Sequence, residues 1–276
     1  MIDMHTNTWF SDGRSSPAEL IDAASALGLS ALAITDHDTV RGYAEVLPHA
    51  RRAGLELVPG VEITTQWVGV SQNVDVLGYF VDVQDAALAE VLALNQAALR
   101  SCIMAACEWL RLQGMRITLE DIQRQNRHAL SYLSVIHALQ AKGYASSYEE
   151  ADTLFRRALG RVEPFGVRTE AAIAAVRSAG GVQVLAHPIY VRLGDPLTAT
   201  DLAPLVEAGL QGIECWHPRL TADDSAYYSA LARSLGLAVS GGSDEHGWPA
   251  GFPALGTQVV TEAMLDDLRG RIVQRP

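Results

Sequence analysis

The chain has 276 residues, of which 49% are hydrophobic and 19% are charged, and its formal net charge is −11. This composition indicates a soluble globular protein and excludes a largely disordered or low-complexity chain. An acidic chain offers no basic track for duplex nucleic acid, although divalent cations bound in one pocket could still make that pocket attract a small phosphorylated substrate.

The cysteines and the hydropathy pattern indicate a cytoplasmic protein without a membrane segment. No apolar run approaches the roughly 18 residues of a membrane span, and the first residues lack the basic start of a signal peptide. Cys102, Cys107 and Cys215 form neither a C-x-x-C motif nor an even disulfide set, so we expect buried, reduced thiols. The sequence leaves the oligomeric state open.

Strand and helix patterns alternate over residues 1–84. Ser16, Pro17 and Glu19 have the types and spacing of a capped helix start, and Gly28 is expected to end that helix. After the opening strand, further strands are expected over residues 29–38, 55–67 and 73–81, with a second helix over 39–54. This βαβ order is typical of a parallel sheet.

The pattern changes near Asp85, and helical periodicity then continues to about Gly160. Beyond it, strands are expected over 181–188, 210–218 and 237–247. We therefore expect a first barrel part (1–84), a helical insertion or cap (85–163) and a second barrel part (164–276). The alternation favours an α/β fold with a (β/α) barrel; a doubly wound open sheet is the alternative, because the pattern does not establish closure.

Metal-ligating residue types recur at the ends of these strands. Each alone fits a turn or surface residue, but their repetition at strand ends favours a metal site at one barrel mouth. Mixed imidazole and carboxylate groups suit Mn²⁺, Fe²⁺ or Zn²⁺ better than Ca²⁺. In chain order the candidates are His5, Asp36, His37, Asp38, Glu62, Asp75, His187, Glu214, His217, Asp244 and His246.

Six motifs resemble those of the PHP family, which is named for polymerases and histidinol phosphatases: DMHTN…SDG, AITDHDT, PGVEIT, VLGYFVD, LAHP and GGSDEHG. The helical stretch is similar to the insertion of stand-alone members that hydrolyse nucleotides and RNA ends. The resemblance implies a distorted (β/α)7 TIM-like barrel with a helical insertion subdomain. It also implies a metal-dependent phosphoesterase that acts on a small metabolite, a nucleotide or an oligonucleotide end, through a hydroxide that bridges two metals.

The resemblance implies three ligand sets. They are Asp12, His37 and His246; His5, Asn7, Glu62 and Asp244; and Glu62, Asp75 and His187. Asn7 and Asp75 stand where the family usually has histidines, and these changes favour harder cations such as Mg²⁺ or Mn²⁺. We expect two to three ions, of which the one at Asp12 is well formed and the one beside Asn7 is weak, solvated or absent.

Catalytic and substrate-binding residues are predicted around this centre. His187 or His217 could protonate the leaving oxygen, and Asp36 is expected to orient a ligand. Related nucleotide-cleaving members usually carry an R-x-H segment in the insertion, where this chain has Tyr132 and Ser134. The candidates for phosphate binding are therefore arginines near strand ends, namely Arg192 first, then Arg41 and Arg219.

Two other functions stay open at this point. The changes at positions 7 and 75, together with the missing insertion Arg and His, fit a catalytically impaired binding protein on the same scaffold. A metal-containing barrel mouth could also hydrolyse a non-phosphate bond such as C–N, because one fold supports many chemistries. Elemental analysis of bound metal would separate these hypotheses best.

Overall fold

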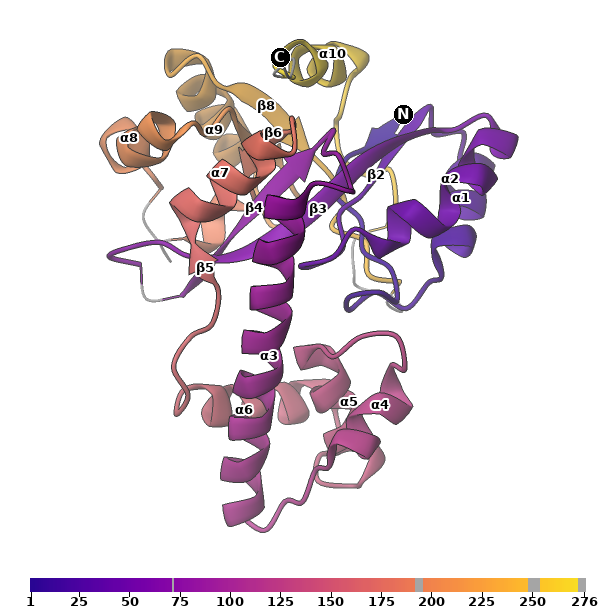
Figure 1. Cartoon of the computed structure of the whole chain (residues 1–276), viewed down its shortest axis with the longest axis vertical. Helices are drawn as coiled ribbons and strands as arrows, with labels where there is room; N and C mark the ends of the chain where they lie inside the picture. The colour runs from indigo at the N-terminus through magenta and orange to yellow at the C-terminus, as the bar shows by residue number, and fades with distance from the viewer. Residues whose placement is uncertain (71, 192–195, 248–253, 273–276) are drawn as a thin grey trace.

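The structure is a computed structural model that describes residues 1–70, 72–191, 196–247 and 254–272 (Figure 1). Within these ranges one sheet contains the strands β1 Ile2–Asp3, β2 Ala31–Ile34, β3 Glu56–Gln66, β4 Asn73–Tyr79, β5 Val167–Arg168, β6 Val182–Leu185, β7 Gly212–Trp216 and β8 Ala238–Gly241. The helices are α1 Pro17–Ala26, α2 Arg41–Ala53, α3 Ala86–Leu112, α4 Leu119–Gln125, α5 Tyr132–Ala141, α6 Tyr148–Leu159, α7 Thr169–Ser178, the 3₁₀ helix η1 Pro188–Tyr190, α8 Ala199–Ala208, α9 Ala222–Ser234 and α10 Glu262–Gly270.

Seven strands form a barrel-shaped sheet in the order β1-β2-β3-β4-β6-β7-β8, and β5 pairs with the last residues of β3. The segments that follow β1 and β8 bring the two ends of this sheet together. Thr6 and Glu245 form a parallel bridge, and the amide of Asp244 donates to the carbonyl of His5 at 2.9 Å. The predicted distorted (β/α) barrel is confirmed, and the alternative of an open doubly wound sheet is wrong.

The prediction of a parallel sheet is wrong at β4. This strand pairs antiparallel with both β3 and β6. Residues 67–72 join β3 to β4, which is too short a connection for a helical crossover, so the chain must reverse. The other ligand candidates lie near the carboxyl ends of their strands, at the barrel mouth. Because β4 is antiparallel to its neighbours, Asp75 lies at the same mouth although it is near the start of its strand.

Alternating side chains build two apolar layers, one inside the barrel and one outside it. In β2, Ala31 and Ala33 belong to the inner cluster, whereas Leu32 and Ile34 pack outward against α1 and α2. The outer layer on the opposite side is formed with α7, α8 and α9. These two layers fix the strand ends, and therefore the position of every side chain at the barrel mouth.

The helices α3 to α6 form a projection with a core of its own. Figure 1 shows the long helix α3 leaving the sheet, with α4, α5 and α6 gathered around its far half. Ile103 and Leu110 of α3 pack there with Ile122, Val135 and Phe155. The hydroxyl of Thr118 and the carboxylate of Asp121 form a capping box at the start of α4. The projection faces the barrel mouth, because residues of α3 and α5 line one cavity together with Asp12 and His37.

Sequence analysis does not predict α10. Thr261 caps this helix, and its buried side chains Leu265 and Leu268 join the inner barrel cluster. The short, mainly polar stretch gives a weak periodic signal, although the Thr cap is visible in the sequence. Among the described residues, no helix combines the length and apolarity that crossing a membrane requires.

Candidate metal centre and adjoining cavity

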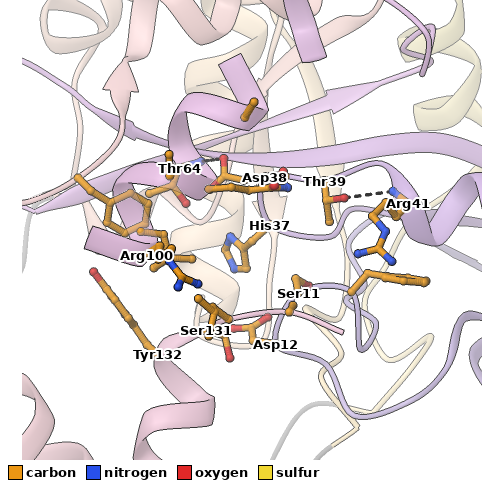
Figure 2. Close-up of a pocket in the computed structure, with 18 of the residues that line it drawn as sticks. Ser11, Asp12, His37, Asp38, Thr39, Arg41, Thr64, Arg100, Ser131 and Tyr132 are labelled. Carbon is orange, nitrogen blue, oxygen red and sulfur yellow. Dashed lines mark hydrogen bonds between the residues drawn. The ribbon is translucent and has the colours of Figure 1, made fainter. Parts of the chain in front are cut away.

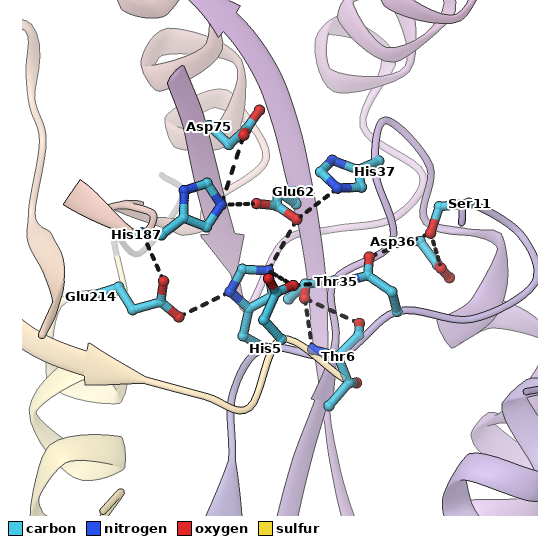
Figure 3. Close-up of polar contacts among 12 residues, drawn as sticks. His5, Thr6, Ser11, Thr35, Asp36, His37, Glu62, Asp75, His187 and Glu214 are labelled. Carbon is cyan, nitrogen blue, oxygen red and sulfur yellow. Dashed lines mark hydrogen bonds and ion pairs between the residues drawn. The ribbon is translucent and has the colours of Figure 1, made fainter. Parts of the chain in front are cut away.

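Glu62 lies at the centre of a buried group of histidines. Its Oε2 atom is 3.0 Å from His5 Nε2 and 3.3 Å from His37 Nε2, and its Oε1 atom is 2.8 Å from His187 Nε2 (Figure 3). The four residues come from β3 and from the segments that follow β1, β2 and β6. Barrel closure therefore collects on one carboxylate three imidazoles that lie far apart in the sequence.

A second group joins this centre through His37. One ligand atom from each of Asp12, His37 and His246 lies within 4.8 Å of the others, and His246 Nε2 is 3.2 Å from Asp12 Oδ1. The structure thus brings together the three residues that the PHP resemblance places around one metal. Their role as ligands remains a prediction.

The remaining groupings differ in detail from the expected sets. Ligand atoms within 4.8 Å of one another are found for His5, Glu62 and His187, and for His37, Glu62 and Asp75. His187 therefore groups with His5 and Glu62, where the resemblance implies Asn7 and Asp244. His37 groups with Glu62 and Asp75, where the resemblance implies His187. Asp244 is still close, because its Oδ1 atom is 3.3 Å from His5 Nε2, and Asp75 Oδ2 is 3.7 Å from His187 Nε2.

Asn7 is buried beside the centre and hydrogen bonds to a candidate ligand. Its side-chain nitrogen donates to Asp244 Oδ1 at 3.2 Å, and its side-chain oxygen accepts from the hydroxyl of Ser11 at 3.3 Å. The amide oxygen, which is the atom a metal would use, is therefore directed to Ser11.

Asp36 and His217 form hydrogen bonds with residues of the segments around the centre. The Asp36 carboxylate is buried and accepts hydrogen bonds from Thr8 and from the Ser11 hydroxyl, so it organises the loop that carries Asn7 and Asp12. His217 Nδ1 accepts from the amide of Arg219, which leaves the proton on Nε2, 3.3 Å from Asp244 Oδ2.

Glu214 is one of the strand-end candidates, and the sequence predicts no specific role for it. Its Oε1 atom is 2.9 Å from His5 Nδ1, and its Oε2 atom accepts from the amide of His187 at 2.7 Å. A carboxylate on the second ring nitrogen fixes the tautomer and the direction of a metal-binding imidazole. The signal was its place late in β7, at the strand end where the other candidates cluster.

Backbone strain is concentrated at this mouth. The four non-glycine residues with positive φ in the described chain are Asp38, Phe80, His187 and Asp244, and three of them belong to the segments that carry candidate ligands. Such conformations cost roughly 1–3 kcal/mol each and persist where surrounding contacts enforce them, commonly at functional sites. For His187 and Asp244, the enforcing contacts include those to Glu214 and His5.

The buried carboxylates of the centre create a negative potential that favours bound positive charge. Burial lowers the pKa of His37, but the negative charges of Glu62 and Asp12 outweigh it and raise the pKa to about 9. Burial also lowers the pKa of His246, but the negative charges of Asp12 and Asp244 outweigh this effect and raise the pKa to about 10. In the metal-free protein these imidazoles therefore carry the positive charge that the carboxylates require.

The donor set also fits divalent metal ions. The Oδ1 atom of Asp75 is buried and has no hydrogen-bond partner among the described residues, so one oxygen of a candidate ligand is left unpaired. Carboxylate oxygens and neutral imidazole nitrogens together suit Mn²⁺, Fe²⁺ and Zn²⁺. The positions fit metal ions better than a purely structural ion-pair network, because an isolated buried carboxylate oxygen is costly.

A cavity of about 600 Å³ opens above the centre, between the barrel mouth and α3 and α5. Figure 2 shows Asp12 and His37 on one wall and Arg100 and Tyr132 on another. Arg41 also lines it, with its guanidinium carbon 4.3 Å from the centre of the Phe10 ring.

The phosphate-binding predictions meet different outcomes in the structure. Arg41 lines the mouth cavity, whereas Arg219 is not among its lining residues and Arg192 lies outside the described residues. Arg100, on α3, was not predicted, because a single arginine on a long helix carries no sequence signal. Its position against the mouth is set by the packing of α3 on α7 and β5.

Comparison with known proteins gives consistent matches. The family model of the PHP domain matches residues 3–162. The chain is 30% identical to the 3′,5′-nucleoside bisphosphate phosphatase of Chromobacterium violaceum, over 89% of this chain and 87% of that protein. It is 28% identical to a 5′-3′ exoribonuclease of Haemophilus influenzae, over 92% of each. A solved structure from Bifidobacterium adolescentis, assigned by inference as a metal-dependent phosphoesterase, aligns with a TM-score of 0.87 and 30% identity over 99% of this chain and 96% of that one.

Proposed function

The chain belongs to the PHP domain family and is a metal-dependent phosphoesterase, and we propose that it removes a terminal phosphate from a nucleotide or an oligonucleotide end. The observation that carries the proposal is the group of three histidines around Glu62, of which His37 also lines a cavity that Arg41 and Arg100 line. Phosphoester hydrolysis needs both parts, a cationic centre at the reacting phosphate and positive side chains that hold its oxygens.

Two to three divalent cations of the Mn²⁺, Fe²⁺ or Zn²⁺ type are proposed for this centre. Candidate ligands are His5, Asp12, His37, Glu62, Asp75, His187, Asp244 and His246, with Asn7 beside them. When bound, such ions supply Lewis acidity that offsets charge on the phosphate and activates water. The chain's own task is to hold these donors rigid, which the contacts of Glu214 and Asp36 do.

Arg41 and Arg100 are proposed to bind phosphate oxygens in the cavity. Arg41 comes from the first turn of α2, and Arg100 comes from α3, so the two guanidinium groups approach from the barrel and from the projection. Arg100 supplies positive charge in the same cavity as Tyr132, which stands where related members usually have an arginine. The presence of Arg100 in this cavity supports phosphate binding despite the missing insertion arginine.

The far part of the cavity suits an aromatic base. Leu99, Tyr132 and Phe165 line it, and the Tyr132 and Phe165 rings lie 6.0 Å apart at 82°. Base–aromatic contacts contribute about 1–3 kcal/mol per base and tolerate different bases. A nucleoside carrying the reacting phosphate therefore fits the shape and the chemistry of the cavity.

His217 is proposed to orient Asp244. Its proton on Nε2 faces Asp244 Oδ2, and its other nitrogen is engaged by the Arg219 amide. His187 is proposed as a metal ligand, because its Nε2 atom faces both Glu62 and Asp75. Neither histidine is assigned the protonation of the leaving oxygen.

The decisive experiment measures metal content and phosphate release together. Purified protein is loaded with Mn²⁺, Fe²⁺ or Zn²⁺, analysed for metal, and assayed on a panel of phosphomonoesters and phosphodiesters. We expect stoichiometric metal and phosphate release that His37→Ala abolishes. The matched control is His49→Ala, since His49 lies on α2 and pairs with Asp22 away from the centre. A metal-replete protein that is inert on the whole panel would overturn the proposal.

A further inference from the structure

The side chain of Asn95, in the first half of α3, is buried at the junction between the barrel and the helical projection. Its nitrogen donates to Asp38 Oδ1 at 2.7 Å and to the carbonyl of Thr64 at 2.7 Å. Its oxygen accepts from the amide of Val167 at 2.9 Å. One amide group therefore contacts the segment after β2, the strand β3 and the strand β5.

Both connections between the barrel and the projection meet at this side chain. The chain leaves the barrel along α3 and returns to it at β5 (Figure 1). Asn95 lies on the outgoing helix and holds the amide of Val167, the first residue of β5. A tilt of the projection against the barrel would break these hydrogen bonds, and a buried polar group without a partner costs about 1–3 kcal/mol.

Asp38 is the residue that Asn95 fixes on the barrel side. It directly follows the candidate ligand His37, and its φ of 52° lies in the left-handed region that a non-glycine residue rarely adopts. Its amide donates to the carbonyl of Glu62 at 2.8 Å, and its own carbonyl accepts from the side chain of Gln96 at 2.8 Å. Two neighbouring residues of α3, Asn95 and Gln96, therefore help to enforce the backbone beside His37.

Arg100 follows on the same helix, about 1.4 turns after Asn95. Figure 2 shows Arg100, Asp38 and His37 around the mouth cavity. A helix is rigid over so short a distance, so the contacts of Asn95 also determine where Arg100 enters the cavity. Asn95 itself is not among the described residues that line the cavity.

Apolar packing alone does not give α3 this precision. Leu88 and Leu92 of α3 belong to the outer apolar cluster together with Ile173 and Val176 of α7. The hydrophobic effect is not directional, so such contacts resist separation of the helices more than they resist sliding. The hydrogen bonds of a buried amide have a direction, and one of them ends on the residue beside His37.

We propose that Asn95 is a positioning residue that couples the arginine wall of the cavity to the metal centre. Through Asp38 it holds the segment of His37, and through the backbone of α3 it holds Arg100, so that both approach one phosphate group. The inference rests on the proposed function, because it assigns to Arg100 a phosphate oxygen and to His37 a metal ion.

The test measures the binding of inorganic phosphate to the Mn²⁺-loaded protein by calorimetry, which requires no turnover. Asn95→Asp keeps the size of the side chain but places a carboxylate against Asp38. We expect this variant to raise the Kd about tenfold, and Arg100→Gln to raise it about tenfold in the wild-type background. In the Asn95→Asp background, Arg100→Gln should add less than about twofold, because the arginine is already displaced. Additive effects would overturn the inference.

Three further variants keep the test independent of a folding defect. Asp38→Asn combined with Asn95→Asp exchanges donor and acceptor across their 2.7 Å contact and should recover most of the lost phosphate affinity. Gln96→Met removes the donor to the Asp38 carbonyl and should raise the Kd about threefold. Ser101→Ala is the matched control, because Ser101 is exposed on α3 and bonds only to the carbonyl of Ala97 in its own helix. An exchanged pair without recovery, or Gln96→Met with wild-type affinity, contradicts the positioning role.

Metal binding provides the second readout. Titration of the metal-free protein with Mn²⁺ should show about tenfold weaker binding for Asn95→Asp and wild-type binding for Ser101→Ala, because the segment of His37 loses support. Unchanged Mn²⁺ affinity of Asn95→Asp would overturn the link to His37. If both affinities fall together but no phosphoester is hydrolysed, the proposed function fails and the positioning role stands. If phosphoesters are hydrolysed but the effects at Asn95 and Arg100 are additive, the positioning role is wrong and the proposed function stands.

Discussion

Asn7 donates a hydrogen bond from its side-chain nitrogen to a carboxylate oxygen of Asp244, 3.2 Å away. The resemblance to the PHP family implies a metal-ligating histidine at this position, whereas the amide of Asn7 hydrogen bonds to one oxygen of a neighbouring candidate ligand. Asp244 also lies 3.3 Å from His5 Nε2, so the same carboxylate serves both residues. We therefore predict a weaker donor set for a metal site beside His5 than for one at Asp12, His37 and His246.

Asn7→His should increase the metal content of the protein. An imidazole at position 7 offers a nitrogen donor beside Asp244, where the amide now only donates a hydrogen bond. We expect about one additional tightly bound ion per chain after dialysis, measured by elemental analysis against wild type prepared in parallel. Gln113→His, an exposed change at the end of α3, is the control for a nonspecific effect of an added histidine. An unchanged metal count would show that Asn7 does not limit occupancy.

Metal binding should release protons near neutral pH. Burial lowers the pKa of His187, but its hydrogen bond to Glu62 and the surrounding carboxylates raise it to about 9, and the pKa of His37 is also raised to about 9. Below these values both rings are protonated, and protons compete with the metal for the same nitrogens. Metal affinity should therefore rise as the pH increases from 6 toward 9.

Calorimetric titration checks this proton release directly. The apparent binding enthalpy at pH 7.5 should differ between two buffers with different ionisation enthalpies, because the buffer takes up the released protons. Equal enthalpies in both buffers would mean that the histidines are already neutral in the metal-free protein. Repeating the titration at pH 9.5 should reduce the difference, since fewer protons remain on the rings.

Gly242→Ala should destabilise the barrel and disturb His5. A Cβ atom at this position would lie 2.3 Å from the backbone nitrogen and 2.4 Å from the Cβ of His5, so the segments after β1 and β8 must separate. Overpacking of this kind costs about 1–3 kcal/mol. Urea unfolding in the presence of a chelator should show that loss. Gly270→Ala is the matched control, because no atom lies within 4 Å of the added Cβ. Equal stability of the two variants would contradict the close packing of Gly242 on His5.

Local features of the fold could be predicted from the sequence, because a few neighbouring residues determine them. Ser16 and Glu19 form the expected capping box at the start of α1, and Gly54 ends α2 in a left-handed conformation. The convergence of ligands at one mouth could also be predicted, since it follows from strand ends in a barrel. The direction of β4 is set by the short connection from β3, which a strand pattern alone does not reveal, and the short helix α10 has only weak hydrophobic periodicity.

The partition of ligands within the centre could not be predicted from spacing. Which imidazoles share Glu62 depends on how the barrel closes, and His5 and His187 meet there from segments that lie far apart in the sequence. The position of Arg100 depends on how the helical projection packs on the mouth. Such contacts between distant segments leave no local pattern that a single sequence reveals.

Glu214→Gln should weaken metal binding while the barrel stays folded. The wild-type carboxylate faces His5 Nδ1 with one oxygen and accepts from the His187 amide with the other. Glutamine keeps one acceptor and places an NH₂ group against the second donor, so one histidine loses its orienting contact. Loss of such a partner typically lowers metal affinity about 10–100-fold.

Metal dependence of the rate separates positioning by Glu214 from general unfolding. We expect phosphate release by Glu214→Gln to approach the wild-type rate as the metal concentration is raised, with the half-saturating concentration shifted upward. Glu90→Gln, an exposed change on α3, should follow the wild-type curve. A variant whose circular dichroism is native but whose rate stays low at saturating metal would place Glu214 in the reaction itself, whereas an unshifted curve would mean that Glu214 does not orient the two histidines.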